Sequence, residues 1–231
     1  MTGTLINVGT VLLGTLIGVV VGRRLPARLQ QRVMAGLGMV TLVIGVDLAL
    51  AWRDTSPLYV LGGVLLGGLV GEAIGIERRL EALGDRIQRA VQRDEHSTVS
   101  EAFVTASLLF CVGPLTVVGA IQDGLTGDYD ALATKALLDG FAAIALSATL
   151  GWGVAIGALT ILVVQGGISL GAGVFEDVLT GEALDSMTSA GGVLIIGISL
   201  KLLDLKDVKV GNFLPALVIA PGLVGIVSLV N

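Results

Sequence analysis

The stretch at residues 111–140, CVGPLTVVGAIQDGLTGDYDALATKALLDG, decides the fold assignment. It begins as a hydrophobic helix that Gly113 and Pro114 interrupt, leaves the apolar region through an acidic Gly-rich loop, and returns as a second helix. The two helices of this hairpin carry Gln122, Asp123, Lys135 and Asp139. Ionisable side chains are costly inside a membrane, so these residues need either partners or a function.

The composition places the hairpin in a membrane protein. Hydrophobic residues make up 54% of the 231 residues and charged residues only 14%, with a mean hydropathy of +0.91. This balance is much more apolar than that of soluble domains. The sequence therefore predicts one all-α integral membrane domain over residues 1–231, with the lipid bilayer as its surroundings. The net charge of -5 and the scattered basic residues argue against a nucleic-acid partner.

Apolar segments of spanning length predict a bundle of about eight transmembrane helices. They cover residues 4–22, 33–51, 58–76, 101–122, 132–150, 152–172, 187–204 and 212–230. We read the first as a retained span, because the N-terminus lacks the basic leader of a signal peptide. Alternating spans place twelve of the fourteen Lys and Arg residues on one side, and only Arg53 and Lys135 on the other. Since cytoplasmic loops are rich in Lys and Arg, both termini are predicted outside.

The connector at residues 77–98 is amphipathic. One helical face carries Leu80, Leu83, Ile87 and Val91, and charged residues occupy the others. This pattern predicts an interfacial helix on the cytoplasmic leaflet. The alternative is a solvated charged linker with some helical content.

Two matches suggest an internal repeat. LVIGVDLAL at residues 42–50 resembles LIIGISLKL at 194–202, and GLVG at 68–71 recurs at 222–225. The two offsets are nearly equal, so repeat A at 4–76 would correspond to repeat B at 152–230. A displacement of five spans inverts the second copy around the central hairpin at 101–150, an arrangement found in many secondary transporters. The alternative is a duplication with a structural role only.

Several motifs resemble those of a known family. They are GTLINVGTVLLGTLIG, FCVGPLTVVGAIQDGLTGDY, VVQGGISL, MTSAGGVLIIGISLKLL and NFLPALVIAP, which together extend over nearly the whole chain. They resemble the bacterial YqgA/YdfK family of multi-spanning membrane proteins. This resemblance implies a bacterial cytoplasmic (inner) membrane protein of the topology above, and it brings no substrate or activity with it.

Polar residues of both repeats and of the hairpin are predicted in the outer half of the membrane. The candidate substrate- or ion-binding residues are Asp47, Gln122, Asp123, Lys135, Asp139 and Gln165. Lys135 and Asp139 lie four residues apart, so they form either a structural ion pair or part of a pathway. Asp47 has no charged neighbour at helical spacing and is either a proton- or cation-linked carboxylate or a hydrated group at the interface. The alternative for Gln122 and Asp123 is that they only mark the C-terminus of a helix. The alternative for Gln165 is an ordinary interhelical hydrogen bond.

The motifs of zinc proteases and phosphate-binding loops are not present. HExxH and GxxxxGK[ST] do not occur, and the single Cys111 and the single His96 are not spaced to bind a metal together. We therefore expect no catalysis, cofactor or metal. Glycines at four-residue spacing, Gly14, Gly18 and Gly22 and then Gly63, Gly67, Gly71 and Gly75, predict close helix packing or a homo-oligomer interface.

These observations favour a secondary transporter of a small solute or cation, with its site in the outer half of the bundle. The alternatives are a non-transporting membrane scaffold or sensor subunit, or a passive channel.

Overall fold

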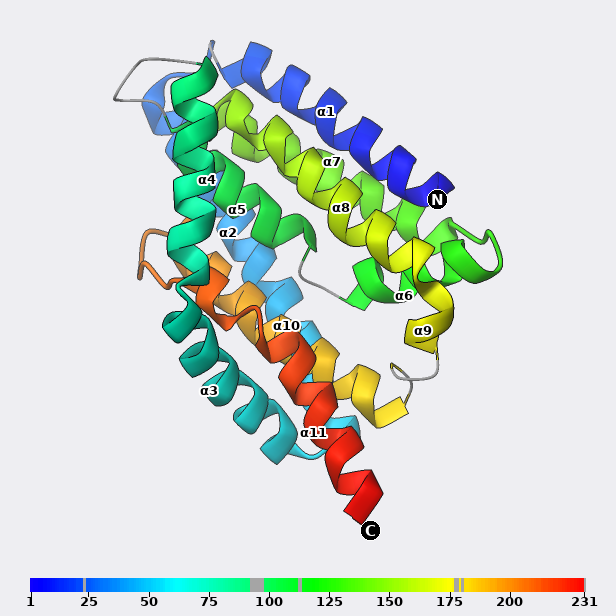
Figure 1. The fold of residues 1–231 in the computed structure, drawn as a ribbon. Coiled ribbons are helices and arrows are strands. Elements are labelled where there is room, and N and C mark those ends of the chain that lie inside the picture. The colour runs from blue at the N-terminus through cyan, green and yellow to red at the C-terminus, as the bar shows by residue number, and fades with distance from the viewer. Residues whose placement is uncertain (23, 92–97, 112–113, 177–178, 180, 231) are drawn as a thin grey trace. The chain divides into compact units, whose positions relative to one another are not determined.

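The fold is all-helical over the part of the chain that the structure, a computed structural model, describes (Figure 1). The described residues are 1–22, 24–91, 98–111, 114–176, 179 and 181–230. His96 and Gly113 of the sequence analysis therefore lie outside them, as do Arg23 and Arg93 among the counted basic residues. The chain divides into two compact units, which are treated separately below.

Among the described residues, seven helical segments are long and apolar enough to cross a membrane, and a bent pair of helices raises the number to eight if the pair forms one span. This confirms the predicted bundle of about eight spans. The unbroken spans contain α1 (Thr2–Gly22), α2 (Ala27–Ala49), α3 (Pro57–Ile74), α7 (Asp130–Leu150), α8 (Gly157–Leu170), α10 (Gly181–Leu202) and α11 (Ala216–Val230). Helices α8 and α11 reach spanning length together with the 3-10 turns that precede them. The bent pair is α5 (Val99–Cys111) and α6 (Pro114–Leu125), whose axes differ by 63°.

Short helices complete the chain. They are α4 (Ile76–Val91), α9 (Ala172–Glu176) and three 3-10 turns, η1 (Leu50–Asp54), η2 (Trp152–Ile156) and η3 (Val210–Phe213). Helix α4 covers most of the predicted amphipathic connector, and Leu83 on its predicted apolar face is exposed. Residues 92–97 of that connector are not described, and its interfacial location stays a prediction.

Local chemistry explains where several helices begin and end. Ser56 accepts a hydrogen bond from the Leu58 N–H at 3.4 Å, and Pro57 occupies the first helical position of α3. The same helix ends at Gly75, whose φ of 71° is a left-handed conformation that glycine adopts without strain. Gly151, with φ of 82°, ends α7 and permits the very tight junction to η2 that the sequence requires.

Unit 1 contains residues 1–37, 79–111 and 115–173 and is organised around the pairing of α1 with α7. In Figure 1 these helices lie side by side, and α8 packs against α1. A Cβ atom on Gly14, Gly18 or Gly22 would clash with a backbone oxygen of α7, that of Gly140, Ile144 or Ala148 respectively. These glycines therefore permit backbone contact, as predicted, and they do so within a single chain.

Unit 2 contains residues 38–78, 112–114 and 174–231 and is built from antiparallel helix pairs. On α3, a Cβ atom added to Gly63, Gly67 or Gly71 would meet Ala220, Ala216 or Asn212 respectively, so the partner's numbering falls as that of α3 rises. Contacts of Gly38 with Leu203, and of Gly45 with Ile196, show the same direction for α2 and α10.

These antiparallel pairs bear on the repeat. Each joins a helix of repeat A to the helix of the same rank in repeat B, and the opposite direction of the two helices is what an inverted duplication requires. The agreement supports the inverted repeat, which stays a prediction.

Candidate functional site

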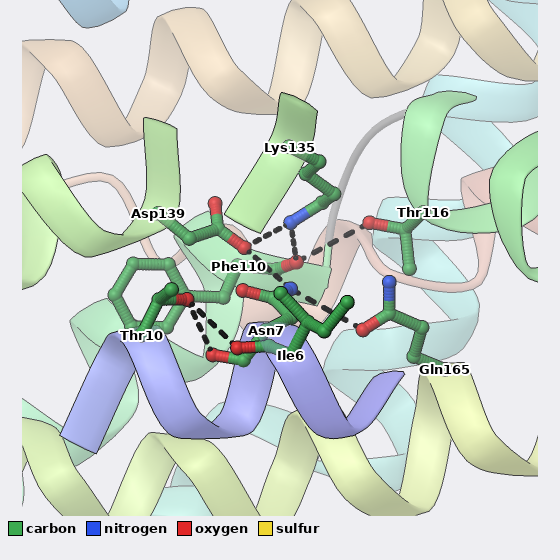
Figure 2. A network of polar contacts seen from close by, with 8 residues as sticks. All are labelled: Ile6, Asn7, Thr10, Phe110, Thr116, Lys135, Asp139 and Gln165. Atoms are coloured by element: carbon green, nitrogen blue, oxygen red, sulfur yellow. Dashed lines mark hydrogen bonds and ion pairs between the residues drawn. The ribbon is translucent and has the colours of Figure 1, made fainter. Parts of the chain in front are cut away.

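A cluster of polar side chains lies inside unit 1, among helices that are otherwise apolar (Figure 2). Asn7 comes from α1, Lys135 and Asp139 from α7, and Gln165 from α8. The exposed fractions of these four residues are 1%, 6%, 7% and 0% in that order. We call them the polar cluster. Polar groups buried to this extent need hydrogen-bond partners.

Lys135 and Asp139 form the charged part of the polar cluster. They are one helical turn apart, and the Lys135 Nζ donates to Asp139 Oδ2. The same ammonium donates to the main-chain oxygen of Phe110 at 2.7 Å, and Thr116 donates to that oxygen at 3.3 Å. The positive and negative charges thus offset one another within a buried site.

The break between α5 and α6 explains why the Phe110 oxygen is available. The last carbonyls of a helix have no intrahelical partner, and α5 ends at Cys111. Lys135 satisfies one of these carbonyls. The interrupted helix of the central hairpin is therefore joined to α7 through this ammonium group.

Asn7 connects the charged pair to α8. Its Nδ2 donates to Asp139 Oδ2 at 2.9 Å and to Gln165 Oε1 at 3.2 Å. The close packing of α1 on α7 places Asn7 at this position, because Asn7 precedes Gly14 by two helical turns and lies on the same helical face. Three helices thereby share one hydrogen-bonded network, as Figure 2 shows.

Some buried polar atoms around the network have no hydrogen-bond partner in the described part of the chain. Four of them lie on α1 and α8, namely Thr4 Oγ1, Asn7 Oδ1, Gln165 Nε2 and Ser169 Oγ. Thr15 Oγ1 lies further along α1. Leaving such an atom unsatisfied costs about 1–3 kcal/mol, so several of these atoms in one place suggest a binding site.

Asp123 holds the beginning of α1. Its Oδ2 accepts from the Gly3 N–H at 3.1 Å and lies 2.8 Å from the amino nitrogen of Met1. Next to it, a Cβ atom on Gly124 would clash with the Ser169 main-chain oxygen of α8. The end of α6 therefore contacts both α1 and α8.

The structure brings together some of the six residues selected from the sequence. Lys135, Asp139 and Gln165 belong to the polar cluster, and Asp123 is buried elsewhere in unit 1. Gln122 is exposed on α6. Asp47 is exposed on α2 in unit 2, and its position relative to the polar cluster is not determined.

Several groups that belong to the site were not selected from the sequence. Asn7 was not among the six selected residues, although its spacing from Gly14 places it on the helical face that packs against α7. Thr4 and Ser169 carry no signal, because small hydroxyl residues are common in membrane helices. The Phe110 carbonyl could be inferred only from the helix break that follows it. Among the described residues, no group of three His, Cys, Asp or Glu side chains is placed to bind a metal.

Comparison with known proteins gives the family. Residues 2–225 match the family described as "Protein of unknown function (DUF554)". The chain belongs to this family. It is 32% identical over 223 residues to "Uncharacterized membrane protein YdfK" of Bacillus subtilis (strain 168), with 96% of this chain and 94% of the relative covered.

A second relative agrees. The chain is 29% identical over 222 residues to "Uncharacterized protein YqgA" of Escherichia coli (strain K12), with 94% of each chain covered. No solved structure matches the chain. These relatives confirm the family resemblance read from the motifs, and the name of YdfK agrees with a membrane protein.

Proposed function

We propose that this protein moves a small solute or ion across the bacterial cytoplasmic membrane, and that the polar cluster is its binding site. The observation that carries this proposal is the buried Lys135–Asp139 pair, surrounded by polar atoms that no described protein group satisfies. Intramembrane ionisable residues commonly mark substrate or ion pathways. The interrupted α5–α6 pair beside the cluster is a further feature of many transporter sites.

The proposal includes an orientation. Twelve of the fourteen basic residues lie in or beside the loops assigned to one side, which we take as the cytoplasmic side, so both termini face outward. The polar cluster then lies in the outer half of the bundle. We propose transport and no catalysis, because the cluster contains no nucleophile with an adjacent base.

One observation favours a scaffold as the second candidate. Lys135 and Asp139 satisfy each other and a main-chain oxygen, so the pair joins α5 to α7 without any ligand. In that case the pair would act only to fix the arrangement of helices, and the unpartnered atoms would have no role.

A thermal-shift screen of the purified protein against salts and small neutral solutes separates the two candidates. Transport requires binding, and a ligand at a hundred times its dissociation constant adds about 2.7 kcal/mol to the free energy of unfolding. For a chain of this size the melting temperature would then rise by about 5 °C or more. Asp139→Asn should abolish that rise. A melting temperature that no solute or ion changes would contradict transport and favour the scaffold.

A further inference from the structure

Asp139 determines which groups of the polar cluster donate hydrogen bonds and which accept them. An ionised carboxylate can only accept, and Asp139 is paired with the Lys135 ammonium. Asn7 must therefore present its Nδ2 to Asp139. The second N–H of that amide is then directed at Gln165, which must present Oε1.

This direction determines which atoms remain without partners. Asn7 Oδ1 is left as an acceptor, and Gln165 Nε2 is left as a donor with two N–H groups. Figure 2 shows both atoms without a dashed line. Rotating either amide by 180° does not help. It would set the Asn7 oxygen against the Asp139 carboxylate, or the Gln165 NH₂ group against that of Asn7.

Two hydroxyl groups lie one turn from these amides. Thr4 precedes Asn7 on α1, and Ser169 follows Gln165 on α8. Both turns reach the same end of α6, because Asp123 binds the Gly3 N–H and Gly124 contacts the Ser169 oxygen. A hydroxyl can donate or accept, so these two groups adapt to whatever the amides bind.

The charges of the polar cluster exclude a strong preference for ions. Lys135 and Asp139 bring one positive and one negative charge, which cancel. A bound monovalent ion would add a buried charge without a counter-charge in the cluster, at a high desolvation cost. A cation would also meet the Gln165 donor, and an anion would meet the Asn7 acceptor.

We infer that the ligand of this site is an uncharged molecule that offers both a hydrogen-bond acceptor, for Gln165 Nε2, and a donor, for Asn7 Oδ1. This inference rests on the proposed function and narrows its substrate class. Water has this chemistry, and so do small neutral solutes such as amides and polyols.

The test uses the full-length protein in proteoliposomes and measures permeability by stopped-flow light scattering. A sucrose gradient reports water, and gradients of acetamide and glycerol report neutral solutes. Fluxes of Na⁺, K⁺ and Cl⁻ are followed in parallel with ion-sensitive dyes. We expect at least one neutral permeability to rise several-fold above that of protein-free vesicles, with no ion flux. The water, acetamide and glycerol arms identify which source of this chemistry the site accepts.

Gln165→Glu tests the position of the site. The substitution keeps the shape of the side chain and replaces the unpartnered donor by an acceptor, so the part of the neutral permeability that exceeds that of protein-free vesicles should fall at least tenfold. Gln31→Glu makes the same change at an exposed position of α2 and should retain the wild-type permeability. Should Gln165→Glu fail to fold, Gln165→Met removes the same donor without adding charge.

The outcomes distinguish a failure of the neutral-ligand inference from a failure of the proposed transport function. Ion flux through the wild-type protein without neutral permeation overturns the neutral ligand and leaves transport standing. Movement of none of these probes, together with a flat thermal-shift screen, overturns the proposed function itself. Unchanged neutral permeability in a folded Gln165 variant overturns this position for the site.

Discussion

The two units differ in how completely their buried polar side chains are hydrogen-bonded. In unit 2, Asn212 lies on η3 and both polar atoms of its side chain are hydrogen-bonded. Its Oδ1 accepts from the Glu77 N–H at 2.8 Å, and its Nδ2 donates to Glu72 at 2.5 Å. The Glu77 carboxylate in turn accepts from the Gly211 N–H at 2.6 Å. In unit 1, Asn7 satisfies two partners with its nitrogen and none with its oxygen.

The difference distinguishes structural from functional polar groups. The network around Asn212 is explained by folding alone, because it joins the end of α3 and the start of α4 to η3. Among the described residues, every buried side-chain atom found without a partner belongs to unit 1. Unsatisfied polar groups are costly, so their confinement to one unit suggests that this unit binds something the other does not.

The largest expected effect is in unit 1. Lys135→Met leaves the Asp139 carboxylate buried without its counter-charge, which should lower the free energy of unfolding by about 3–5 kcal/mol. Replacing both residues, as Lys135→Met with Asp139→Leu, should recover most of that loss. Thermal unfolding in detergent measures both. An equal loss of stability in the double variant would show that the two charges do not compensate one another. It would contradict the description of the polar cluster of unit 1 given above.

A smaller effect is expected in unit 2. Asn212→Leu removes the acceptor of the buried Glu77 N–H and should cost about 1–3 kcal/mol of stability. Because this network is structural, the permeability per folded molecule should stay at its wild-type value. Reconstitution followed by the same light-scattering assay checks this. Loss of transport in a stably folded Asn212→Leu protein would place function in unit 2 as well.

The smallest effect is expected at Asp47. This carboxylate is exposed in unit 2, so Asp47→Asn should change the free energy of unfolding by no more than about 0.5 kcal/mol. It should leave permeability and its pH dependence unchanged. Permeability measured at several pH values provides the test. A clear loss would restore Asp47 as the proton- or cation-linked carboxylate that its sequence environment suggested.

Most of the fold was predictable because apolar length is a strong signal. The differences lie at helix ends: α2 begins at Ala27 where a span from residue 33 was predicted, and α10 begins at Gly181 where residue 187 was predicted. In both cases the helix continues through residues too polar for an apolar segment. Hydropathy locates the apolar part of a helix, whereas backbone hydrogen bonds continue beyond it.

The site was only partly predictable. Lys135 and Asp139 could be paired from their spacing, since four residues on one helix place them on one face. The link from Asp139 through Asn7 to Gln165 joins residues far apart in sequence, and no local pattern encodes it. For Asp47, spacing showed the lack of a charged neighbour, yet it could not show that the side chain lies on an exposed face of α2.

The glycine contacts between α1 and α7 also limit how unit 1 can move. With backbone oxygens of α7 this close to Gly14, Gly18 and Gly22, neither helix can slide along the other without separating. The two helices should therefore behave as one rigid body, which keeps Asn7 hydrogen-bonded to Asp139. Two hydrogen bonds leave this pair: the one from Asn7 to Gln165 crosses to α8, and the one from Lys135 to the Phe110 oxygen crosses to α5. A displacement of α8 or α5 relative to the pair would therefore break one of these two bonds first.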